Sequence, residues 1–396
     1  EACYVLTLDA AGRAATGAEF PLGKYEIRET KGNAYYQCNT GWSQTFEVTM
    51  GGNTAFSFNV ANTPVKGHIQ LTKIDSTDDK PLTGAVFTVT HPDGHTENMV
   101  EEANGIHALR NLRYGKYTVQ ETKAPEGYLL DPTVYTVNIT ENGKTYVVQT
   151  AGFNGIANEP IRGHFRVTKV ETGTTTPLQG AEYTVKAPDG SLIGVYTTDA
   201  SGSFEVRDLL YGKGYTYQET KAPAGYLVDP TVYKFDITED DRTYTYTRED
   251  APQPGFIAIK KFDTHNNPMS GVTCKLEYSL DDGGTWLPVT SRAPDAPLTP
   301  GTSSTPGIVD GVLTTNENGA LLFDGLRINS QTRNIRYRLT EVATTNGHTL
   351  LAGTAFDGYL DQDHPTQIIV ATNGAAFELP TSGSTELAVV QLIGAA

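Results

Sequence analysis

A near-identical stretch occurs twice in this chain of 396 residues, as YTVQETKAPEGYLLDPTVY at 117–135 and YTYQETKAPAGYLVDPTVY at 215–233. Shorter relatives of its first half are KYEIRETKGN at 24–33 and RYRLTE at 336–341. Such repetition indicates that similar structural units follow one another in series, because each copy must build the same local structure.

The pattern inside each unit is typical of β-strands. Apolar and polar residues alternate along most segments, and no segment of useful length has apolar residues at helical spacing. Glycine (40 residues) and proline (21 residues) separate these segments, as turns between short strands require. We therefore predict an all-β chain of tandem immunoglobulin-like β-sandwiches, joined by short proline-containing junctions into an elongated rod.

Three similar junctions, NTPVKG, NEPIRG and DAPQPG, predict the domain boundaries. The predicted divisions are a partial N-terminal domain at 1–64, domains at 65–160, 161–252 and 253–378, a Pro/Ser/Thr-rich insertion at about 280–310 in the last domain, and a C-terminal segment at 379–396.

Charge and cysteine content narrow the classes of partner. The net charge of −16 opposes binding to nucleic acid or to an anionic membrane, so we expect neither. Three cysteines are too few for a disulfide scaffold. Cys274 is expected to be a buried thiol, whereas Cys3 and Cys38 either form a disulfide or remain free.

Each complete domain places three polar residues on strand faces that are otherwise apolar. Residues two apart on a strand share a face. By this rule a lysine continues the apolar row of the first strand, a glutamate that of the repeated box, and an Asn or Asp that of the last strand. The sets are Lys73, Glu121 and Asn158; Lys169, Glu219 and Asp250; and Lys261, Glu341 and Asn373. The first domain has Glu29 and Asn62, with no lysine that can be matched to them. Its Asn62 ends an alternating row with Phe56, Phe58 and Val60, which predicts a closing strand there as well.

Two interpretations of these sets remain open on the residues alone. One is a buried ion pair beside a hydrogen-bonded amide, which offsets the cost of burying charge. The other is chemical: a lysine in apolar surroundings loses its charge and becomes a nucleophile. A buried glutamate then moves protons while an amide bond forms between lysine and Asn or Asp, releasing ammonia or water.

The strand lysine, the Y-x-x-x-E-T-K-A-P-x-G-Y box and the Asn before a proline resemble the collagen-adhesin B-type (Cna B, or SpaA-like) domains of Gram-positive surface proteins. The resemblance is specific in the second and third domains and looser in the first and fourth. It implies a prealbumin-like, inverse immunoglobulin sandwich with isopeptide bonds. The implied bonds are Lys73–Asn158 assisted by Glu121, Lys169–Asp250 assisted by Glu219, and Lys261–Asn373 assisted by Glu341.

The C-terminal segment resembles a sortase sorting signal, L-P-x-T-G, with serine in the fourth place. Its residues are Leu379, Pro380, Thr381, Ser382 and Gly383. The resemblance implies cleavage after Ser382 and covalent attachment to cell-wall peptidoglycan or to other pilins. An apolar run follows at 387–394, and we expect the sequence to stop inside an anchor segment.

The function implied is a cell-wall-anchored stalk or pilus subunit on the outside of a Gram-positive cell, although no polymerisation box of the Y-P-K type is present. The alternative is an adhesin that contacts a host matrix protein or glycan, through the insertion or through a region before residue 1. We expect no enzyme activity beyond formation of the protein's own bonds, no cofactor and no metal. The HPDGHTE stretch at 91–97 is interpreted as a turn with solvated histidines, and DGYLDQDHP at 357–365 lacks the regular acidic spacing of a calcium loop.

Overall fold

The computed structural model describes residues 3–17, 19–53 and 55–376 of the chain. Regular structure in these residues is β throughout, apart from the three-residue 3-10 helix η1 (Ala103–Gly105), as the alternating pattern predicts. No helix in this part of the chain has the length and apolar character needed to cross a membrane. Two compact units divide the chain between Ile161 and Arg162, and each unit is described separately below.

The first unit contains a two-stranded sheet and one complete sandwich. β1 (Gly23–Arg28) pairs antiparallel with β2 (Ser43–Val48), and the stretch around Phe58 that we expect to close this domain forms no strand. The sandwich that follows has one sheet in the order β10-β3-β7-β6, with β11 also on β3, and a second in the order β5-β4-β8-β9. Its strands are β3 (Lys66–Asp75), β4 (Val86–Thr90), β5 (Thr96–Asn98), β6 (Val100–Glu101), β7 (Ile106–Arg113), β8 (Gly115–Lys123), β9 (Val134–Ile139), β10 (Thr145–Val148) and β11 (Ile156–Asn158).

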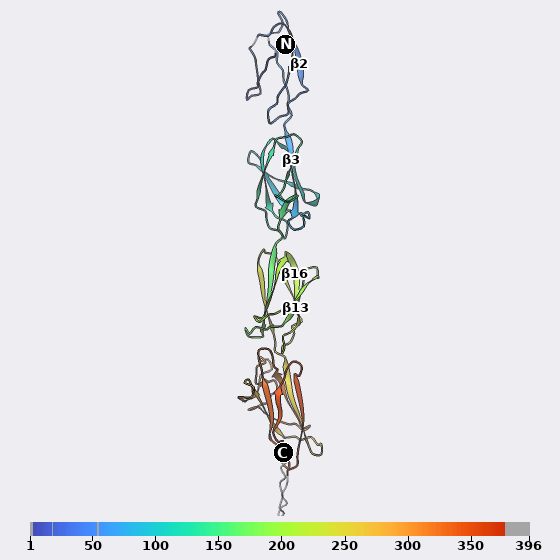
Figure 1. Cartoon of the computed structure of the whole chain (residues 1–396), viewed down its shortest axis with the longest axis vertical. Helices are drawn as coiled ribbons and strands as arrows, with labels where there is room; N and C mark the ends of the chain where they lie inside the picture. Colours follow the sequence, from blue (N-terminus) through green and yellow to red (C-terminus); the bar gives the residue numbers. More distant parts are fainter. Residues whose placement is uncertain (1–2, 18, 54, 377–396) are drawn as a thin grey trace, which may run out of the picture. The chain divides into compact units, whose positions relative to one another are not determined.

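The second unit contains two further sandwiches, and the colours of Figure 1 show that the strands of each come from one continuous stretch of chain. One pairs a β15-β12-β18 sheet with a β14-β13-β16-β17 sheet. Its strands are β12 (Arg162–Glu171), β13 (Glu182–Lys186), β14 (Leu192–Thr197), β15 (Ser203–Leu210), β16 (Gly212–Lys221), β17 (Val232–Ile237) and β18 (Thr243–Asp250).

The other sandwich of this unit pairs a β25-β19-β28 sheet with a β21-β20-β26-β27 sheet, in which β24 also lies against β20. Its main strands are β19 (Pro254–Asp263), β20 (Thr273–Ser279), β24 (Val312–Thr314), β25 (Ala320–Arg327), β26 (Arg336–Ala343), β27 (Thr354–Tyr359) and β28 (Thr366–Asn373). The predicted insertion at about 280–310 is structured, with short strands β21 (Leu287–Pro288), β22 (Thr290–Ser291) and β23 (Thr302–Ser303). Trp286 in this insertion packs under the guanidinium of Arg338.

Each complete sandwich has its own apolar core, built by strict alternation. Along β3, buried Ile69 and Leu71 are followed on the same face by Lys73, which is fully buried. Lys169 on β12 and Lys261 on β19 occupy the same place in the other two cores. The period-2 pattern thus places a lysine inside each core, as the sequence predicts.

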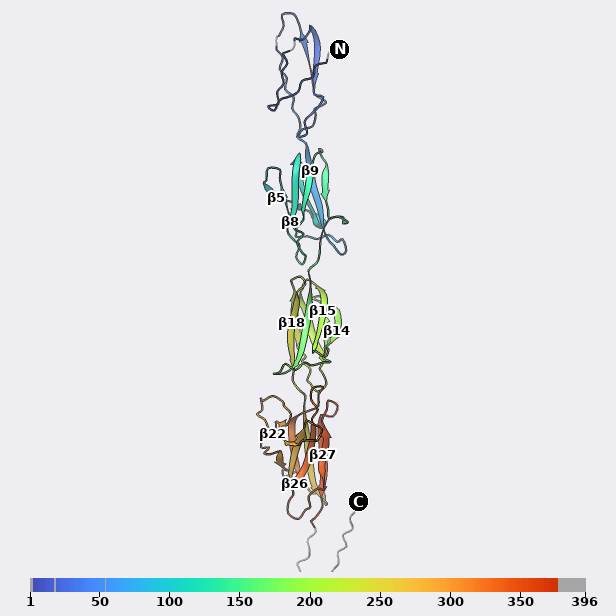
Figure 2. The ribbon, with the colours of Figure 1, turned by 60° about the vertical axis from the view of Figure 1, so that its left-hand side comes forward.

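In all three sandwiches the first and last strands are parallel neighbours, whereas nearly all other pairs are antiparallel. Lys73 of β3 is opposite Ile156, Lys169 of β12 is opposite Arg248, and Lys261 of β19 is opposite Ala371. Figure 2 labels β18 and β15, the two strands that flank β12 in its sheet. In each case the residue two positions after the lysine's partner is Asn158, Asp250 or Asn373, so the parallel register delivers the Asn or Asp to the lysine.

The structure shows Cys3, Cys38 and Cys274 as free thiols. Cys3 is an exposed free thiol and Cys38 a half-buried one, whose Sγ lies 3.9 Å from the carbonyl oxygen of Glu29. The disulfide alternative for this pair is therefore wrong in this structure. Cys274 is fully buried, as predicted, and burial raises the pKa of its thiol to about 12.

Gly155 provides a test of this strand arrangement, because β11 must lie flush against β3. A Cβ at residue 155 would be 2.3 Å from the carbonyl oxygen of Thr72. We expect Gly155→Ala to lower the free energy of unfolding by about 1–3 kcal/mol, as overpacking does. Urea denaturation measures this, with Gly41→Ala as control, since a Cβ there meets nothing closer than 3.9 Å. Equal stability of the two variants would show that β11 does not need this close approach.

Candidate functional site: three buried Lys–Glu–Asx triads

In the second domain, the predicted residues meet in the core. Lys73 Nζ lies 2.5 Å from Asn158 Oδ1 and 2.9 Å from the carbonyl oxygen of Ile156. The Asn158 amide nitrogen donates to both carboxylate oxygens of Glu121, at 2.9 and 3.0 Å. Glu121 Oε1 is 3.7 Å from Lys73 Nζ, and Oε2 accepts the backbone N–H of Asp131 at 2.8 Å. We call each such set of lysine, glutamate and Asn or Asp a triad.

The third domain has the same triad with an aspartate. Lys169 Nζ is in ion-pair contact with Asp250 Oδ1 and lies 3.3 Å from Glu219 Oε1. The carbonyl oxygen of Glu249 is 3.4 Å from the same nitrogen. Glu219 Oε2 accepts the backbone N–H of Asp229 at 2.7 Å. All three ionisable side chains are at most 1% exposed, so each lacks the water that would stabilise its charge.

The fourth domain repeats the geometry despite its degraded box. Lys261 Nζ is 2.5 Å from Asn373 Oδ1 and 2.8 Å from Glu341 Oε2. Asn373 Nδ2 donates to Glu341 Oε1 at 2.6 Å and to Thr344 Oγ1 at 2.8 Å. The backbone N–H of Leu351 lies 3.3 Å from Glu341 Oε2. The alternating row therefore identifies Lys261, and not the adjacent exposed Lys260, as the lysine of this triad.

One backbone contact is common to every glutamate of this type. Its Oε2 faces the backbone N–H of the residue ten positions later in the chain, an amide of the loop after the strand. The pairs are Glu29 with Asn39, Glu121 with Asp131, Glu219 with Asp229, and Glu341 with Leu351. This contact leaves the second carboxylate oxygen to face the Asn or Asp. The constant spacing is a signal that the sequence carries and that our sequence analysis does not use.

The repeated box supplies the surroundings of this glutamate. In each of its two copies, the tyrosine that directly follows the glycine donates a hydrogen bond to an acidic residue on the first strand of the domain. This acidic residue lies two positions after the lysine of the triad. The last tyrosine donates to the aspartate that follows the leucine or valine. These bonds are Tyr128 to Asp75 (2.8 Å), Tyr226 to Glu171 (2.7 Å), Tyr135 to Asp131 (2.8 Å) and Tyr233 to Asp229 (2.6 Å). The box is therefore a scaffold that fixes the loop carrying the N–H donor.

The first domain has the acceptor half of a triad without a lysine. Asn62 Nδ2 donates to Glu29 Oε1 at 2.7 Å, as Asn158 does to Glu121. Asn62 Oδ1 is buried and has no hydrogen-bond partner among the described residues. In the other domains the corresponding oxygen faces the lysine nitrogen. Among the described residues, the first domain thus has the glutamate and asparagine of a triad, with an unpaired amide oxygen at the place where the other Asn domains have the lysine contact.

Burial sets the protonation states needed for chemistry. Desolvation lowers the pKa of Lys73 from its ordinary 10.5 to about 8, against the opposing pull of Glu121. Desolvation likewise raises the pKa of Glu219 to about 7, and it raises the pKa of Asp250. A lysine with a pKa near 8 is neutral in about a tenth of molecules at pH 7, which provides a nucleophilic amine. Because the pKa of Glu219 lies near 7, its carboxyl group is protonated in a large share of molecules at neutral pH and can supply a proton for a leaving oxygen.

These contacts can support formation of a side-chain amide. The lysine nitrogen is held against the carboxamide or carboxyl group, and the glutamate lies within 3.7 Å of that nitrogen in every triad. In the two Asn triads the glutamate bonds the amide nitrogen, not the carbonyl oxygen. This position suits transfer of a proton from the lysine to the leaving nitrogen better than polarisation of the carbonyl.

Fold and triads together define a chain of tandem prealbumin-like β-sandwich domains. Residues 67–152 and 163–252 match the family model of the SpaA prealbumin-like fold domain. The second and third domains thus belong to the SpaA prealbumin-like family, in agreement with the resemblance found in their sequence.

Relatives support the same assignment. Serine-aspartate repeat-containing protein E of Staphylococcus aureus strain USA300 is 28% identical over 277 residues, which cover 63% of this chain and 22% of that protein. Bone sialoprotein-binding protein of Staphylococcus aureus is 26% identical over 275 residues, with the same two coverages. The chain thus spans 22% of the length of these relatives. Among solved structures, the Bacillus anthracis TIE protein is similar over 79% of this chain and 52% of its own, with 25% identity and a TM-score of 0.57.

The lowered pKa of Lys73 generates a pH prediction for a chain in which this lysine stays free, as in Asn158→Ala. The folded state binds fewer protons than the unfolded state between pH 8 and 10.5, because the folded pKa is about 8 and the unfolded one 10.5. Stability therefore rises as pH rises through this window, by up to about 3 kcal/mol. Urea unfolding at pH 7.5 and 10 measures this change in stability. The double variant Lys73→Met/Asn158→Ala is the control, because it lacks the Lys73 amine and should not show the change. The same pH dependence in both variants would contradict the assignment.

Proposed function

We propose that this chain is a structural segment of a Gram-positive cell-surface protein, a stalk or pilus subunit, whose complete domains are each closed by an isopeptide bond that the domain forms itself. The observation that carries the proposal is the contact between lysine and Asn or Asp, at 2.5 Å in both Asn triads, among fully buried side chains. A glutamate in each triad supplies the acid and base.

The proposed reaction is balanced within each triad. In the second and fourth domains, the neutral lysine nitrogen attacks Cγ of Asn158 or Asn373, a C–N amide bond forms, and the original C–N bond breaks. The glutamate takes the proton released by the lysine and returns it to the departing nitrogen, which leaves as ammonia. In the third domain the attack is on Cγ of protonated Asp250, and water leaves. No oxidant, cofactor or second substrate is needed.

The position of the bonds suits a load-bearing role. Each bond would join the first and last strands of its sandwich, which are the strands through which tension on the chain ends enters the domain. A covalent link between these strands passes the load across without extending the sequence between them. It also constrains the unfolded chain, since the joined residues are 85 and 112 positions apart in the two Asn triads. A closed loop of this length contributes about 4–5 kcal/mol in the chain-entropy treatment of cross-links.

Attachment to the cell wall is part of the proposal. The sorting-signal residues 379–383 lie outside the described residues, so their role depends on their similarity to L-P-x-T-G. A sortase would cleave after Ser382 and join the chain to peptidoglycan or to another pilin. The protein would then act outside the cell.

An adhesin function is the second candidate, and it is favoured by one relative that is named as a bone sialoprotein-binding protein. The candidate binding site is the insertion at about 280–310. Its short strands β22 and β23 distinguish the fourth domain from the second and third. A host matrix protein such as bone sialoprotein is then the partner to test, with a host glycan as the other.

Intact mass tests the bonds. We expect the recombinant full chain to be lighter than its sequence mass by about 17, 17 and 18 Da for two losses of ammonia and one of water, about 52 Da in total. Electrospray mass spectrometry of the denatured chain measures this directly. A chain at full sequence mass would contradict the proposed bonds and leave the triads as buried ion pairs.

The role of the glutamate is tested separately by Glu121→Gln. This change keeps the side-chain shape but removes the proton acceptor, so we expect the mass deficit to fall by about 17 Da, from the second domain alone. The exposed Glu141→Gln is the matched control and should retain the full deficit. An undiminished deficit in Glu121→Gln would show that the bond forms without this carboxylate.

The adhesin alternative is tested by replacing residues 280–310 with a short Gly/Ser loop. If the insertion binds bone sialoprotein, surface plasmon resonance should detect binding by the full chain and at least a tenfold loss in the variant. Retention of the mass deficit from the fourth domain is the control for folding. Binding that is equal in both proteins, or absent from both, would exclude the insertion as a binding site for that partner.

A further inference from the structure

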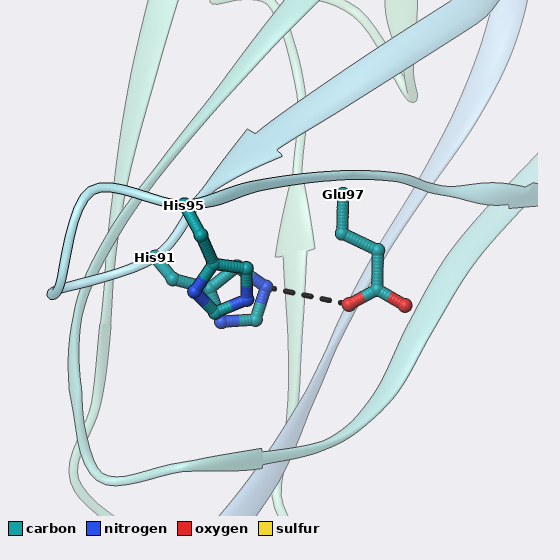
Figure 3. Close-up of side chains that lie close together, drawn as sticks. All are labelled: His91, His95 and Glu97. Atoms are coloured by element: carbon teal, nitrogen blue, oxygen red, sulfur yellow. Dashed lines mark ion pairs between the residues drawn. The ribbon is translucent and has the colours of Figure 1, made fainter.

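We propose that His91, His95 and Glu97 form a binding site for a divalent transition-metal ion of the zinc type, on the β4–β5 hairpin of the second domain. One ligand atom from each side chain lies within 4.8 Å of the other two. Figure 3 shows the two imidazole rings stacked face to face, with the Glu97 carboxylate beside the nearer ring nitrogen of His91. The site is separate from the triads and uses none of their residues.

The hairpin register brings the three side chains to one face. Val89 pairs with Glu97 across β4 and β5, and two residues farther along the hairpin, the backbone N–H of His91 donates to the carbonyl of His95 at 2.9 Å. Directly opposed residues in an antiparallel pair point to the same side. His91 and His95 therefore face each other, with ring centroids 3.7 Å apart, and Glu97 lies two residues farther along the same face.

His91 has a buried ring nitrogen that makes no hydrogen bond and could therefore bind a metal ion. Its side chain is only 12% exposed, and Nε2 is buried with no hydrogen-bond partner. The carboxylate oxygen Oε2 of Glu97 lies 3.4 Å from this nitrogen. The ring is held from behind by Tyr117, at 5.2 Å between centroids in an edge-on arrangement. The sequence-based interpretation of this stretch as a turn is confirmed. The expectation that its histidines are solvated is wrong for His91, because the His91 side chain is mostly buried.

His95 already has the hydrogen-bond partner that a metal-bound histidine usually has. Its Nδ1 donates to Asp93 Oδ1 at 2.5 Å, which leaves Nε2 as the free lone pair. A carboxylate that accepts the second ring N–H is the usual outer partner of a ligating histidine, and it fixes both the tautomer and the ring orientation. Asp93 also accepts the backbone N–H of His95 at 3.2 Å, so the carboxylate itself is fixed by the turn.

The ligand set and spacing suit zinc better than calcium or magnesium. Two imidazoles and one carboxylate are a common catalytic-type zinc set, whereas Ca²⁺ and Mg²⁺ prefer oxygen ligands alone. Tetrahedral ligands at 2.0–2.1 Å from zinc are about 3.3 Å from each other. His91 Nε2 and Glu97 Oε2 are already at 3.4 Å. The side chains of His95 and Glu97 are more than half exposed and free to close the remaining distance, with a fourth position left for water.

The third domain provides an internal comparison. Its hairpin has the same turn, in which Ala187 N–H donates to the Ser191 carbonyl and Gly190 N–H to the Ala187 carbonyl, both at 2.9 Å. The ligand positions there hold Ala187, Ser191 and Ile193. The turn therefore needs neither histidine nor glutamate, and nothing in the fold requires these three residues in the second domain.

The test uses the full chain and Co²⁺, which reports coordination through its visible absorption, followed by displacement with Zn²⁺. We expect one Co²⁺ per chain with the spectrum of a four-coordinate ion, and one Zn²⁺ by isothermal titration calorimetry. His91→Ala/His95→Ser/Glu97→Ile, which installs the residues of the third-domain hairpin, should weaken binding at least 100-fold. Asp93→Asn keeps the turn acceptor but loses the charge, and should weaken binding about tenfold.

Two controls make the result decisive. The triple variant must keep the circular dichroism of the unmodified chain and the same deficit of intact mass relative to its own sequence mass, which shows that its domain still folds. The reciprocal variant Ala187→His/Ser191→His/Ile193→Glu should bind a second ion. No four-coordinate Co²⁺ spectrum in the unmodified chain, or equal affinity in the unmodified chain and the triple variant, would overturn the proposal.

Discussion

The burial of a lysine in each sandwich core is the constraint on which the rest of the structure depends. An isolated buried ammonium costs several kcal/mol even after relaxation, so a core that contains one must either pair it or neutralise it. Here, desolvation moves the pKa of Lys73 towards the neutral amine, while a carboxylate and an amide oxygen lie beside it. The same burial that makes the lysine costly makes it reactive, and the proposed bond would remove the cost permanently.

The topology explains how three separate sandwiches solve this problem in the same way. Parallel pairing of the first and last strands fixes a register in which the Asn or Asp follows the lysine's partner by two residues. The repeated box then holds its glutamate from the other sheet, through a backbone N–H ten residues farther on. Register places the two reactants, and the box places the proton carrier.

Much of this arrangement can be predicted from the sequence because strand alternation is local. The rows that end in Lys73, Lys169 and Lys261 show directly which side chains point inward, and the junctions place each row at the start of a unit. The parallel register is not predictable in this way, because it depends on pairing between segments at opposite ends of a domain. Strand alternation also does not predict the loop amide that contacts each glutamate, because the position of this amide depends on the path of an irregular loop.

Two local expectations fail for related reasons. The stretch that contains Phe58 alternates like a strand, yet it forms none, because alternation indicates a possible strand without supplying its neighbour. His91 lies in a polar turn sequence, and its burial depends on a ring contact with Tyr117 from another strand. Strand formation around Phe58 and burial of His91 both depend on a contact with a distant part of the chain. The residues next to them in the sequence do not indicate whether that contact forms.

The central claim, that lysine and Asn or Asp are joined, is tested most directly by a crystal structure of the chain at a resolution that separates bonded from non-bonded atoms. The claim predicts continuous density between Lys169 Nζ and Asp250 Cγ, with the planar geometry and the C–N length of an amide, about 1.33 Å. Separate density for the two side chains, with these atoms about 3 Å or more apart as in a hydrogen-bonded ion pair, would contradict it.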